Sequence, residues 1–380
     1  MNSTRLVSIL WTAGIAAAGP IYTVTDLGSL GGSSAQAFGL SSNGQAAGAA
    51  TTPFGYSHAF TSTNSAITDL TINTNASEGI ASGVNASGQV VGTAYVNGQA
   101  FATIWMDSTT QAIAAAGSYA LAINNAGQVA GMLTSDGQGH AFVTENGAVV
   151  DLGTLSGGSW ASAYGINDQG EVAGYGQVAN GTFHAFVWSA SSGYTVLGTL
   201  GGSNSYAMSI NDSGQAAGNS QTASGYSHAF LETGGVLQDL GTLGGNSSYG
   251  YGVNDAGETV GYSFVAGNGM THAFLYQNGV MIDLNSLIAA ASGWILTEAY
   301  AINDRGEIVG SGLLNGVEQA FRLDYAGGSA ILDPQPLQTS TLATPEPGTI
   351  LTFTIGLVLI FLSRLRLGRP LPAPPPEPQR

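Results

Sequence analysis

Apolar residues occur along most of this chain in short runs that glycine-containing turns separate. Residues 160–200 show the pattern: the runs SAYGI, EVAGYG, HAFVWS and YTVLGT follow one another, with the turn NDQG after the first and SSG after the third. Runs of this length between turn residues are typical of β-strands joined as hairpins. The body shows no sustained apolar spacing of 3.6 residues, and its best helical candidate is residues 284–294. The pattern therefore predicts an all-β fold.

One nine-residue pattern recurs through the body. An apolar residue precedes Asn, a Gly follows the Asn after three residues, and a second Gly follows after four more. Its copies are residues 40–48, 84–92, 123–131, 166–174, 210–218, 253–261 and 302–310. Their starts are 44, 39, 43, 44, 43 and 49 residues apart, and the insertion at 284–294 accounts for the longest interval. A fixed period near 43 residues indicates a repeat architecture.

Two further motifs accompany each copy. His-Ala-Phe begins at residues 58, 140, 184, 228 and 272, and Gln-Ala-Phe begins at 99 and 319. A third motif, DLGTLGG or a variant, begins at Asp26, Asp151 and Asp239, with VLGTLGG at Val196. Four strands of about five or six residues with their turns occupy roughly 40 to 45 residues, which is the size of a β-propeller blade. The sequence predicts a seven-bladed β-propeller of about 43-residue four-stranded repeats over residues 20–333; an open β-solenoid is the alternative.

The repeated apolar positions are the candidate core. We expect the residue before each Asn and the Phe of each HAF or QAF motif to pack between blades, each Phe contributing about 1.5 to 3 kcal/mol. These residues are Val84, Ile123, Ile166, Ile210, Val253 and Ile302, with Phe60, Phe101, Phe142, Phe186, Phe230, Phe274 and Phe321.

Ring closure requires a fourth strand for the last repeat. The stretch at residues 21–28 matches a fourth strand and not a first, whereas the seventh repeat supplies only its first three. We expect residues 21–27 to complete the last blade and to cover its edge. Residues 330–333 are the competing candidate.

Charge and composition narrow the function classes. Charged residues make up 8% of the chain, and 23 acidic against 7 basic residues give a net charge of −16. An acidic body repels phosphate backbones, so we expect no nucleic-acid partner. Cysteine is absent, which excludes disulfides and thiolate chemistry.

The two ends have the order of parts found in export signals. Residues 1–19 place Arg5 before an apolar run and small residues, as in a signal peptide; a helix packed on the domain is the alternative. Residues 348–363 are an uncharged apolar run before a basic cluster, which predicts a transmembrane helix with residues 364–380 as a basic, Pro-rich cytoplasmic tail. The alternative for residues 348–363 is a helix buried in a globular domain. Residues 334–347 form a Pro- and Thr-rich linker.

Two resemblances follow from these motifs. Pro-Glu-Pro, an apolar run and arginines in this order resemble the PEP-CTERM sorting signal of Gram-negative bacteria; the residues are Pro345, Glu346, Pro347, Arg364, Arg366 and Arg369. That resemblance implies recognition by an exosortase, an inner-membrane intermediate and delivery to the outer envelope or outside. The repeats INDxGQVVG, HAF and DLGTLGG are similar to those of HAF-repeat proteins, which are described as extracellular. The resemblance to this family implies an extracellular location and a repeat architecture. It implies no established reaction.

Candidate chemistry in the repeats is sparse. All five histidines occupy one motif position, so we interpret them as side chains that fix a turn, with metal binding as the alternative. Turn chemistry explains the Asn-Asp-x-Gly segments, and we expect no cofactor; calcium at a few acidic loops is the weaker alternative. No catalytic motif is complete, so we expect no enzyme.

Two functions are consistent with these observations. The first is an exported, non-catalytic scaffold or adhesion protein, with the export machinery, the membrane and exopolysaccharide as its expected partners. The alternative is a lectin-like propeller whose repeated aromatic residues stack on sugars; the candidates are Tyr56, Tyr175, Tyr226 and Tyr262.

Overall fold

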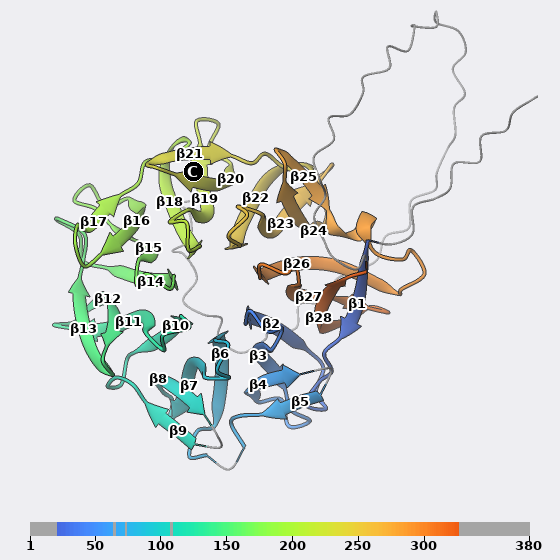
Figure 1. Ribbon diagram of the computed structural model, residues 1–380, viewed down its shortest axis with the longest axis horizontal. Coiled ribbons are helices and arrows are strands. Elements are labelled where there is room, and N and C mark those ends of the chain that lie inside the picture. The colour runs from blue at the N-terminus through green and yellow to red at the C-terminus, as the bar shows by residue number, and fades with distance from the viewer. Residues whose placement is uncertain (1–20, 64–65, 73, 107–108, 327–380) are drawn as a thin grey trace, which may run out of the picture. The chain divides into compact units, whose positions relative to one another are not determined.

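The chain folds into seven four-stranded antiparallel sheets arranged around a central axis (Figure 1). The computed structural model describes residues 21–63, 66–72, 74–106 and 109–326. Within these residues it contains β-strands and one 3₁₀ helix, and no α-helix. The prediction of an all-β, seven-bladed propeller is confirmed, and the alternative of an open β-solenoid is wrong.

Each blade uses its first strand nearest the axis and its fourth at the rim (Figure 1). The first strands are β2 (Ala35–Leu40), β6 (Glu78–Val84), β10 (Tyr119–Ile123), β14 (Ala161–Ile166), β18 (Gly201–Ile210), β22 (Gly244–Val253) and β26 (Trp294–Ile302). The second strands are β3 (Ala46–Thr51), β7 (Val90–Val96), β11 (Val129–Ser135), β15 (Val172–Gln177), β19 (Ala216–Thr222), β23 (Thr259–Val265) and β27 (Ile308–Leu314). The third strands are β4 (Ser57–Thr63), β8 (Gln99–Met106), β12 (Gln138–Glu145), β16 (Phe183–Ser189), β20 (Ser227–Thr233), β24 (Thr271–Gln277) and β28 (Val317–Tyr325). The rim strands are β5 (Ala66–Asp69), β9 (Thr109–Ala112), β13 (Ala148–Gly153), β17 (Gly193–Val196), β21 (Val236–Asp239), β25 (Val280–Asp283) and β1 (Tyr22–Asp26).

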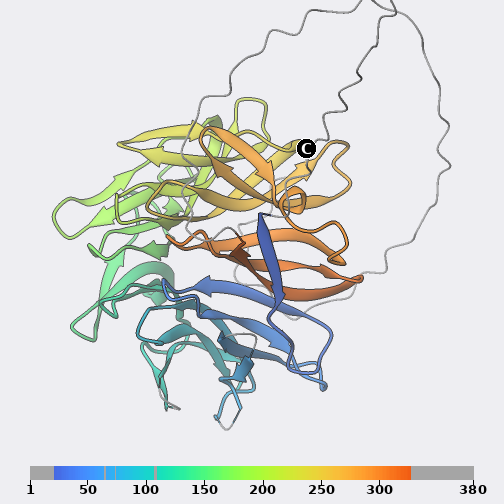
Figure 2. The same cartoon turned by 45° about the vertical axis from the view of Figure 1, so that its right-hand side comes forward.

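Strand β1 closes the ring. It pairs with β28 in antiparallel register, Tyr22 opposite Tyr325 and Asp26 opposite Phe321, and Figure 2 shows it lying across the orange last blade. The expectation that residues 21–27 complete the last blade is confirmed, while the competing residues 330–333 lie outside the described residues. Tyr22 and Leu27 are 5% and 0% exposed, so the closing strand is also part of the core.

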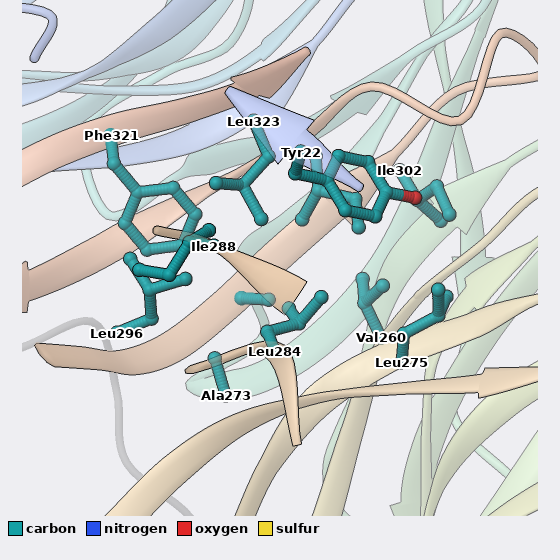
Figure 3. Packing of buried hydrophobic residues seen from close by; sticks show 12 residues of the cluster. Tyr22, Val260, Ala273, Leu275, Leu284, Ile288, Leu296, Ile302, Phe321 and Leu323 are labelled. Carbon is teal, nitrogen blue, oxygen red and sulfur yellow. The ribbon is translucent and has the colours of Figure 1, made fainter. Parts of the chain in front are cut away.

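The core lies between adjacent blades. Six motif phenylalanines are completely buried, and the residues before Asn also belong to hydrophobic clusters, Val84 to one that contains Trp105 and no motif phenylalanine. Figure 3 shows one cluster, where Tyr22 of β1, Phe321 of β28 and Val260 of β23 bring the first and last strands of the propeller and the sixth blade into one packed layer. This confirms the predicted core at all but one phenylalanine.

Phe101 is the exception. In the second blade Gly92 lies opposite Thr103, whereas in the others the corresponding Gly lies opposite the motif Phe. The two-residue Asn97-Gly98 turn has the same length as the turns of the third and seventh blades, where Phe142 and Phe321 lie opposite the Gly eleven residues before them. Phe101 follows Gly92 by only nine residues, so the letters QAF at residue 99 fall two residues before the HAF position. Phe101 therefore stands where other blades have His, and Thr103 where they have Phe; the expected layer position of Phe101 was wrong.

The repeated Asn residues form a hydrogen-bonded belt around the axis. Each Nδ2 donates to the main-chain oxygen at the same position in the next blade, at 2.8–3.3 Å, from Asn85 through Asn124, Asn167, Asn211 and Asn254 to Asn303. Asn303 donates to Ser41, which occupies the Asn position in the first blade, and Asn43 donates to Ala86. The side-chain oxygen of each belt Asn accepts from the amide four residues later in its own turn. The belt explains the Asn of the repeat as a tie between blades as well as a turn residue.

The second Gly of each repeat permits a β-bulge in the inner strand. A Cβ at these glycines would lie 1.9–2.1 Å from a carbonyl oxygen of the neighbouring inner strand; the residues are Gly48, Gly92, Gly131, Gly174, Gly218, Gly261 and Gly310. Each facing inner strand shifts register at this point, for example between Ala163 and Gly165. One extra residue per blade is thereby turned out of the ladder.

Residues 284–294 contain only the 3₁₀ helix η1 (Leu284–Leu287), with the Asp283 side chain accepting from the Asn285 amide at its start, so a longer helix there was wrong. Among the described residues, no helix is long and apolar enough to cross a membrane. The expected signal peptide at 1–19, the linker at 334–347, the transmembrane segment at 348–363 and the tail at 364–380 lie outside the described residues.

Candidate functional site

The motif histidines pair with aspartates at the opposite end of each blade from the Asn belt. His58, His140, His228 and His272 place Nδ1 at 2.7–2.9 Å from a carboxylate oxygen of Asp69, Asp151, Asp239 and Asp283, respectively. Because a carboxylate only accepts, Nδ1 is the donor. The fifth, His184, has no such partner and instead lies 3.3 Å from the Leu197 main-chain oxygen.

These aspartates shape the linkers between blades. Asp151 also accepts the Gly153 amide at 2.8 Å, and Asp239 accepts the Gly241 amide at 2.8 Å. Burial alone would raise the pKa of Asp151, but the hydrogen bonds from His140 and from that amide lower it below its ordinary value. The arrangement supports the interpretation of the histidines as turn-fixing residues. The aspartate partner was missed in the sequence, although it follows His by eleven residues in each pair.

The Asn-Asp-x-Gly turns add a second tie between blades. Asp168, Asp212, Asp255 and Asp304 each accept the amide of the equivalent residue in the preceding blade, at 2.8–2.9 Å. Burial and the carboxylates of Asp168, Asp255 and Asp304 raise the pKa of Asp212, although the Asp168 amide lowers it. Within the described part of the chain, no three His, Asp or Glu side chains group closely enough to hold a metal ion. The aspartates are thus engaged with the backbone.

The bulges point to the central channel as the best candidate site. The channel has a cavity of about 200 Å³ that all seven inner strands line. The seven bulged residues are part of this lining: Phe38, Ser82, Leu121, Tyr164, Met208, Tyr251 and Tyr300. The residue type at this position differs from repeat to repeat. Its side chain faces the axis, so no packing contact common to all the blades restricts it. The second Gly of the repeat is the sequence signal that could have located it.

Three tyrosines on blades four, six and seven line this cavity, and four more on blades four to six pack against them or against one another. We call this set the tyrosine wall: Tyr164, Tyr175, Tyr206, Tyr249, Tyr251, Tyr262 and Tyr300. Tyr164 stacks on Tyr175 with ring centres 5.1 Å apart, and their hydroxyl oxygens are 3.1 Å apart. Tyr251 contacts both Tyr262 and Tyr300, at 5.8 and 5.2 Å between ring centres. The wall thus consists of two groups of packed rings, Tyr164 with Tyr175 and Tyr206, and Tyr251 with Tyr249, Tyr262 and Tyr300.

Burial keeps these tyrosines neutral. It raises the pKa of Tyr175, Tyr251 and Tyr300 above the ordinary value, and neighbouring tyrosines or Glu298 raise it further. A neutral phenol both donates and accepts a hydrogen bond. The wall therefore offers polar contacts that do not change over the physiological pH range.

One carboxylate belongs to the wall. Glu298 of β26 accepts a hydrogen bond from the Tyr300 hydroxyl. Burial raises the pKa of Glu298, the Tyr300 hydroxyl lowers it, and the nearby Glu318 raises it again, with a net upward shift. A carboxyl group with a raised pKa beside a channel is a frequent feature of ligand sites.

The four surface aromatics expected from the sequence divide into two groups. Tyr56 and Tyr226 are 53% and 48% exposed on turns between second and third strands, as expected. Tyr175 is only 3% exposed and Tyr262 is half-buried, and both belong to the tyrosine wall. The expected surface position of Tyr175 was wrong, because its ring packs on Tyr164 of the inner strand, and Tyr262 is only partly exposed because its ring stacks on Tyr249. The sorting-signal residues lie outside the described residues.

The comparisons with known proteins find similarity in fold. No protein family matches the sequence, and no curated protein sequence matches it either. A puromycin-hydrolyzing peptidase from Mycobacterium tuberculosis has 12% identity and a TM-score of 0.52 over 82% of this chain and 55% of its own. TolB from Acinetobacter baumannii has 11% identity and a TM-score of 0.46 over 74% of this chain and 64% of its own. XC5397 from Xanthomonas campestris, a gluconolactonase, has 10% identity and a TM-score of 0.37 over 82% of this chain and 92% of its own. This chain thus spans less than two thirds of the peptidase and of TolB, and at such identities the likeness extends to the propeller fold alone.

Proposed function

We propose that this chain is an exported, non-catalytic propeller that binds a carbohydrate in its central channel. The tyrosine wall is the observation that carries the proposal. Ring faces and fixed hydroxyls at one concave surface are the groups that stack on sugar rings and hydrogen-bond their hydroxyls. The cavity of about 200 Å³ is smaller than the roughly 300–1,000 Å³ of drug-sized pockets, which suits a single sugar ring.

The contacts of the polar residues favour binding over catalysis. Four histidines each pair with an aspartate of their own blade, and the four pairs lie on four different blades. The described lining of the channel contains no histidine. A nucleophile needs a base within hydrogen-bonding reach, and the one serine at a bulge of this lining, Ser82, has no histidine beside it in the channel.

Channel binding is tested by filling the channel without removing any tyrosine. In the full chain, Ser82→Trp places a large ring in the cavity, so we expect it to abolish the binding of a sugar that a glycan array identifies. Tyr226→Ala removes an exposed aromatic outside the channel and is the control. Melting temperatures show that each variant is folded. Unchanged affinity of Ser82→Trp would contradict a channel site.

A scaffold or adhesion role is the second candidate, and one observation favours it. Phe54 is 87% exposed and Tyr56 53% exposed on one turn of the first blade. Exposed aromatics on a surface turn are suited to contact with another macromolecule. A glycan array without any binding, together with surface attachment that Phe54→Ser reduces, would favour this role over channel binding.

Export to the envelope is part of the same proposal. It depends on the Pro345, Glu346 and Pro347 motif followed by an apolar run and by Arg364, Arg366 and Arg369. Mass spectrometry of the mature C-terminus is the test. We expect a chain that ends near the Pro-Glu-Pro motif in a host with an exosortase, and an intact C-terminus in a host without one.

A further inference from the structure

A carboxylate without a basic partner among the described residues is hydrogen-bonded to Tyr300, a residue of the cavity lining. Glu298 accepts from Tyr300 and has Glu318 nearby, and Glu318 itself accepts from the Gln36 amide at 2.7 Å. The described residues contain two arginines, and both are engaged elsewhere: Arg305 with Glu307, and Arg322 with Asp324 and the Gly44 carbonyl. A partly buried carboxylate without a cation carries a desolvation cost that a cationic ligand would offset.

The aromatic neighbours of this carboxylate also favour a cation. Tyr251 and Tyr262 lie close enough to Glu298 for its charge to raise the pKa of each hydroxyl. Tyrosine faces carry negative potential and attract ammonium groups within about 6 Å of the ring centre. A carboxylate together with several tyrosine rings is thus a receptor for a positively charged nitrogen.

The net negative charge of the whole chain also favours a cationic ligand. A net charge of −16 raises the local concentration of cations near the surface and repels anions. The described wall contributes no group that would neutralise a carboxylate, sulfate or phosphate on a ligand. Acidic sugars are therefore excluded from the channel, and amino sugars are favoured.

We infer that the channel ligand is a sugar that carries a protonated amino group, with the ring on the tyrosine wall and the ammonium at Glu298. The inference rests on the proposed carbohydrate-binding function and narrows it to one class. The sugar ring uses the hydroxyl groups and ring faces of the wall on blades four to six. The ammonium uses Glu298 with the rings of Tyr251 and Tyr262.

The test compares three oligosaccharides that differ at one substituent. Isothermal titration of the full chain uses β-1,4-linked tetramers of glucosamine, of N-acetylglucosamine and of glucose. We expect the glucosamine tetramer to bind at least tenfold more tightly than the other two at pH 6, where its amines are protonated. Methylammonium, which carries the cation without the sugar, is expected to bind at least tenfold more weakly than the glucosamine tetramer.

Variants separate the charge of Glu298 from the charge of the chain. Glu298→Gln keeps the size of the side chain and is expected to reduce affinity for the glucosamine tetramer at least tenfold, with little change for the neutral tetramers. Glu145→Gln makes the same change at an exposed position of β12 and is expected to leave all affinities as they are. Should Glu298→Gln fail to fold, the wild-type preference for glucosamine is expected to disappear at pH values low enough to protonate Glu298.

The outcomes distinguish this inference from the function on which it rests. Equal affinity for the amino and neutral tetramers, or an unaltered preference in folded Glu298→Gln, overturns the role of Glu298 and leaves carbohydrate binding in place. Methylammonium binding as tight as that of the glucosamine tetramer overturns the sugar part. Absence of binding to every sugar overturns both this inference and the proposed function.

Discussion

The Nδ2 atom of Asn303 lies 3.0 Å from the main-chain oxygen of Ser41, and this hydrogen bond joins the last blade to the first across 262 residues of sequence. The same Asn side chain accepts the Glu307 amide at 3.1 Å within its own turn. It is 7% exposed, so water cannot replace these bonds readily. The last blade is therefore held to the first by a buried amide as well as by strand β1.

Asn303→Ala is expected to lower the free energy of unfolding by about 1–3 kcal/mol, because it leaves buried partners without a hydrogen bond. Chemical denaturation measures the change. Asn246→Ala removes an exposed asparagine of β22 and is the matched control, with an expected change of about 0.5 kcal/mol or less. Equal effects of the two substitutions would mean that neither the bond to Ser41 nor the bond to the Glu307 amide contributes measurably to stability.

Removing the closing strand should have a larger effect. Deletion of residues 21–27 exposes the edge of β28 and removes Tyr22 and Leu27 from the core. We expect the melting temperature to fall by roughly 10 °C or more, since each kcal/mol shifts a chain of this size by about 2–4 °C. Thr23→Ala alters an exposed residue of the same strand and should change the melting temperature little. A deletion variant as stable as the wild type would contradict closure by β1.

The second Gly of the repeat allows a prediction with an internal control. A Cβ at Gly174 would lie 2.1 Å from the Ser162 oxygen and 2.7 Å from the Phe186 ring, whereas a Cβ at Gly198 meets nothing within 4 Å. Gly174→Ala should therefore destabilise by about 1–3 kcal/mol or more, while Gly198→Ala stays within about 0.5 kcal/mol. Denaturant titration compares the two. Similar values for both would mean that the inner strand can move away from Gly174.

The sequence was informative where a physical constraint repeats in every blade. The four-strand count, the core positions and the closing strand all followed from the period and from the turns. Phe101 shows the limit of matching motif letters: it follows Gly92 by nine residues, whereas Phe142 follows Gly131 by eleven, and this spacing decides which residue lies opposite the Gly. The tyrosine wall lies beyond that limit too: Tyr164, Tyr251 and Tyr300 share a position with Ser82 and Met208, and only the bulge shows that this position faces the channel.

The histidine–aspartate pairs can be tested by a double-mutant cycle. Asp239→Ala removes the acceptor for both His228 and the Gly241 amide, so it should cost about 1–2 kcal/mol. His228→Gln should cost less than about 1 kcal/mol, since Gln can also donate a hydrogen bond to the carboxylate, and Gln319 occupies this position naturally in the last blade. The double variant should be less destabilised than the sum of the two single changes. Strict additivity would show that the pair does not act as a unit, and a large loss from His228→Gln alone would indicate a role beyond turn fixing.

The pKa of Glu298 predicts the direction in which pH changes stability. Its folded-state pKa is raised above the unfolded value, so between the two values the folded protein binds more protons than the unfolded chain. The free energy of unfolding therefore falls as pH rises through this window, and above it the wild type carries the full penalty, about 1.4 kcal/mol for each unit of pKa difference. Glu298→Gln removes the titrating group, so its stability relative to the wild type should be higher at pH 8 than at pH 4.

Tyr300→Phe tests the pKa of Glu298 by changing its hydrogen-bond partner and leaving the carboxyl group in place. Loss of the hydroxyl removes the hydrogen bond that lowers the pKa of Glu298, so the window in which stability falls should extend to higher pH. Urea denaturation at half-unit intervals from pH 4 to pH 8 gives the curves for the wild type and both variants. Asp212 and Glu232, whose pKa values are also raised, titrate in all three proteins and cancel in the differences. A difference between Glu298→Gln and the wild type that does not vary with pH would mean that Glu298 is solvated like an ordinary surface carboxylate, and the desolvated site at the tyrosine wall would have to be abandoned.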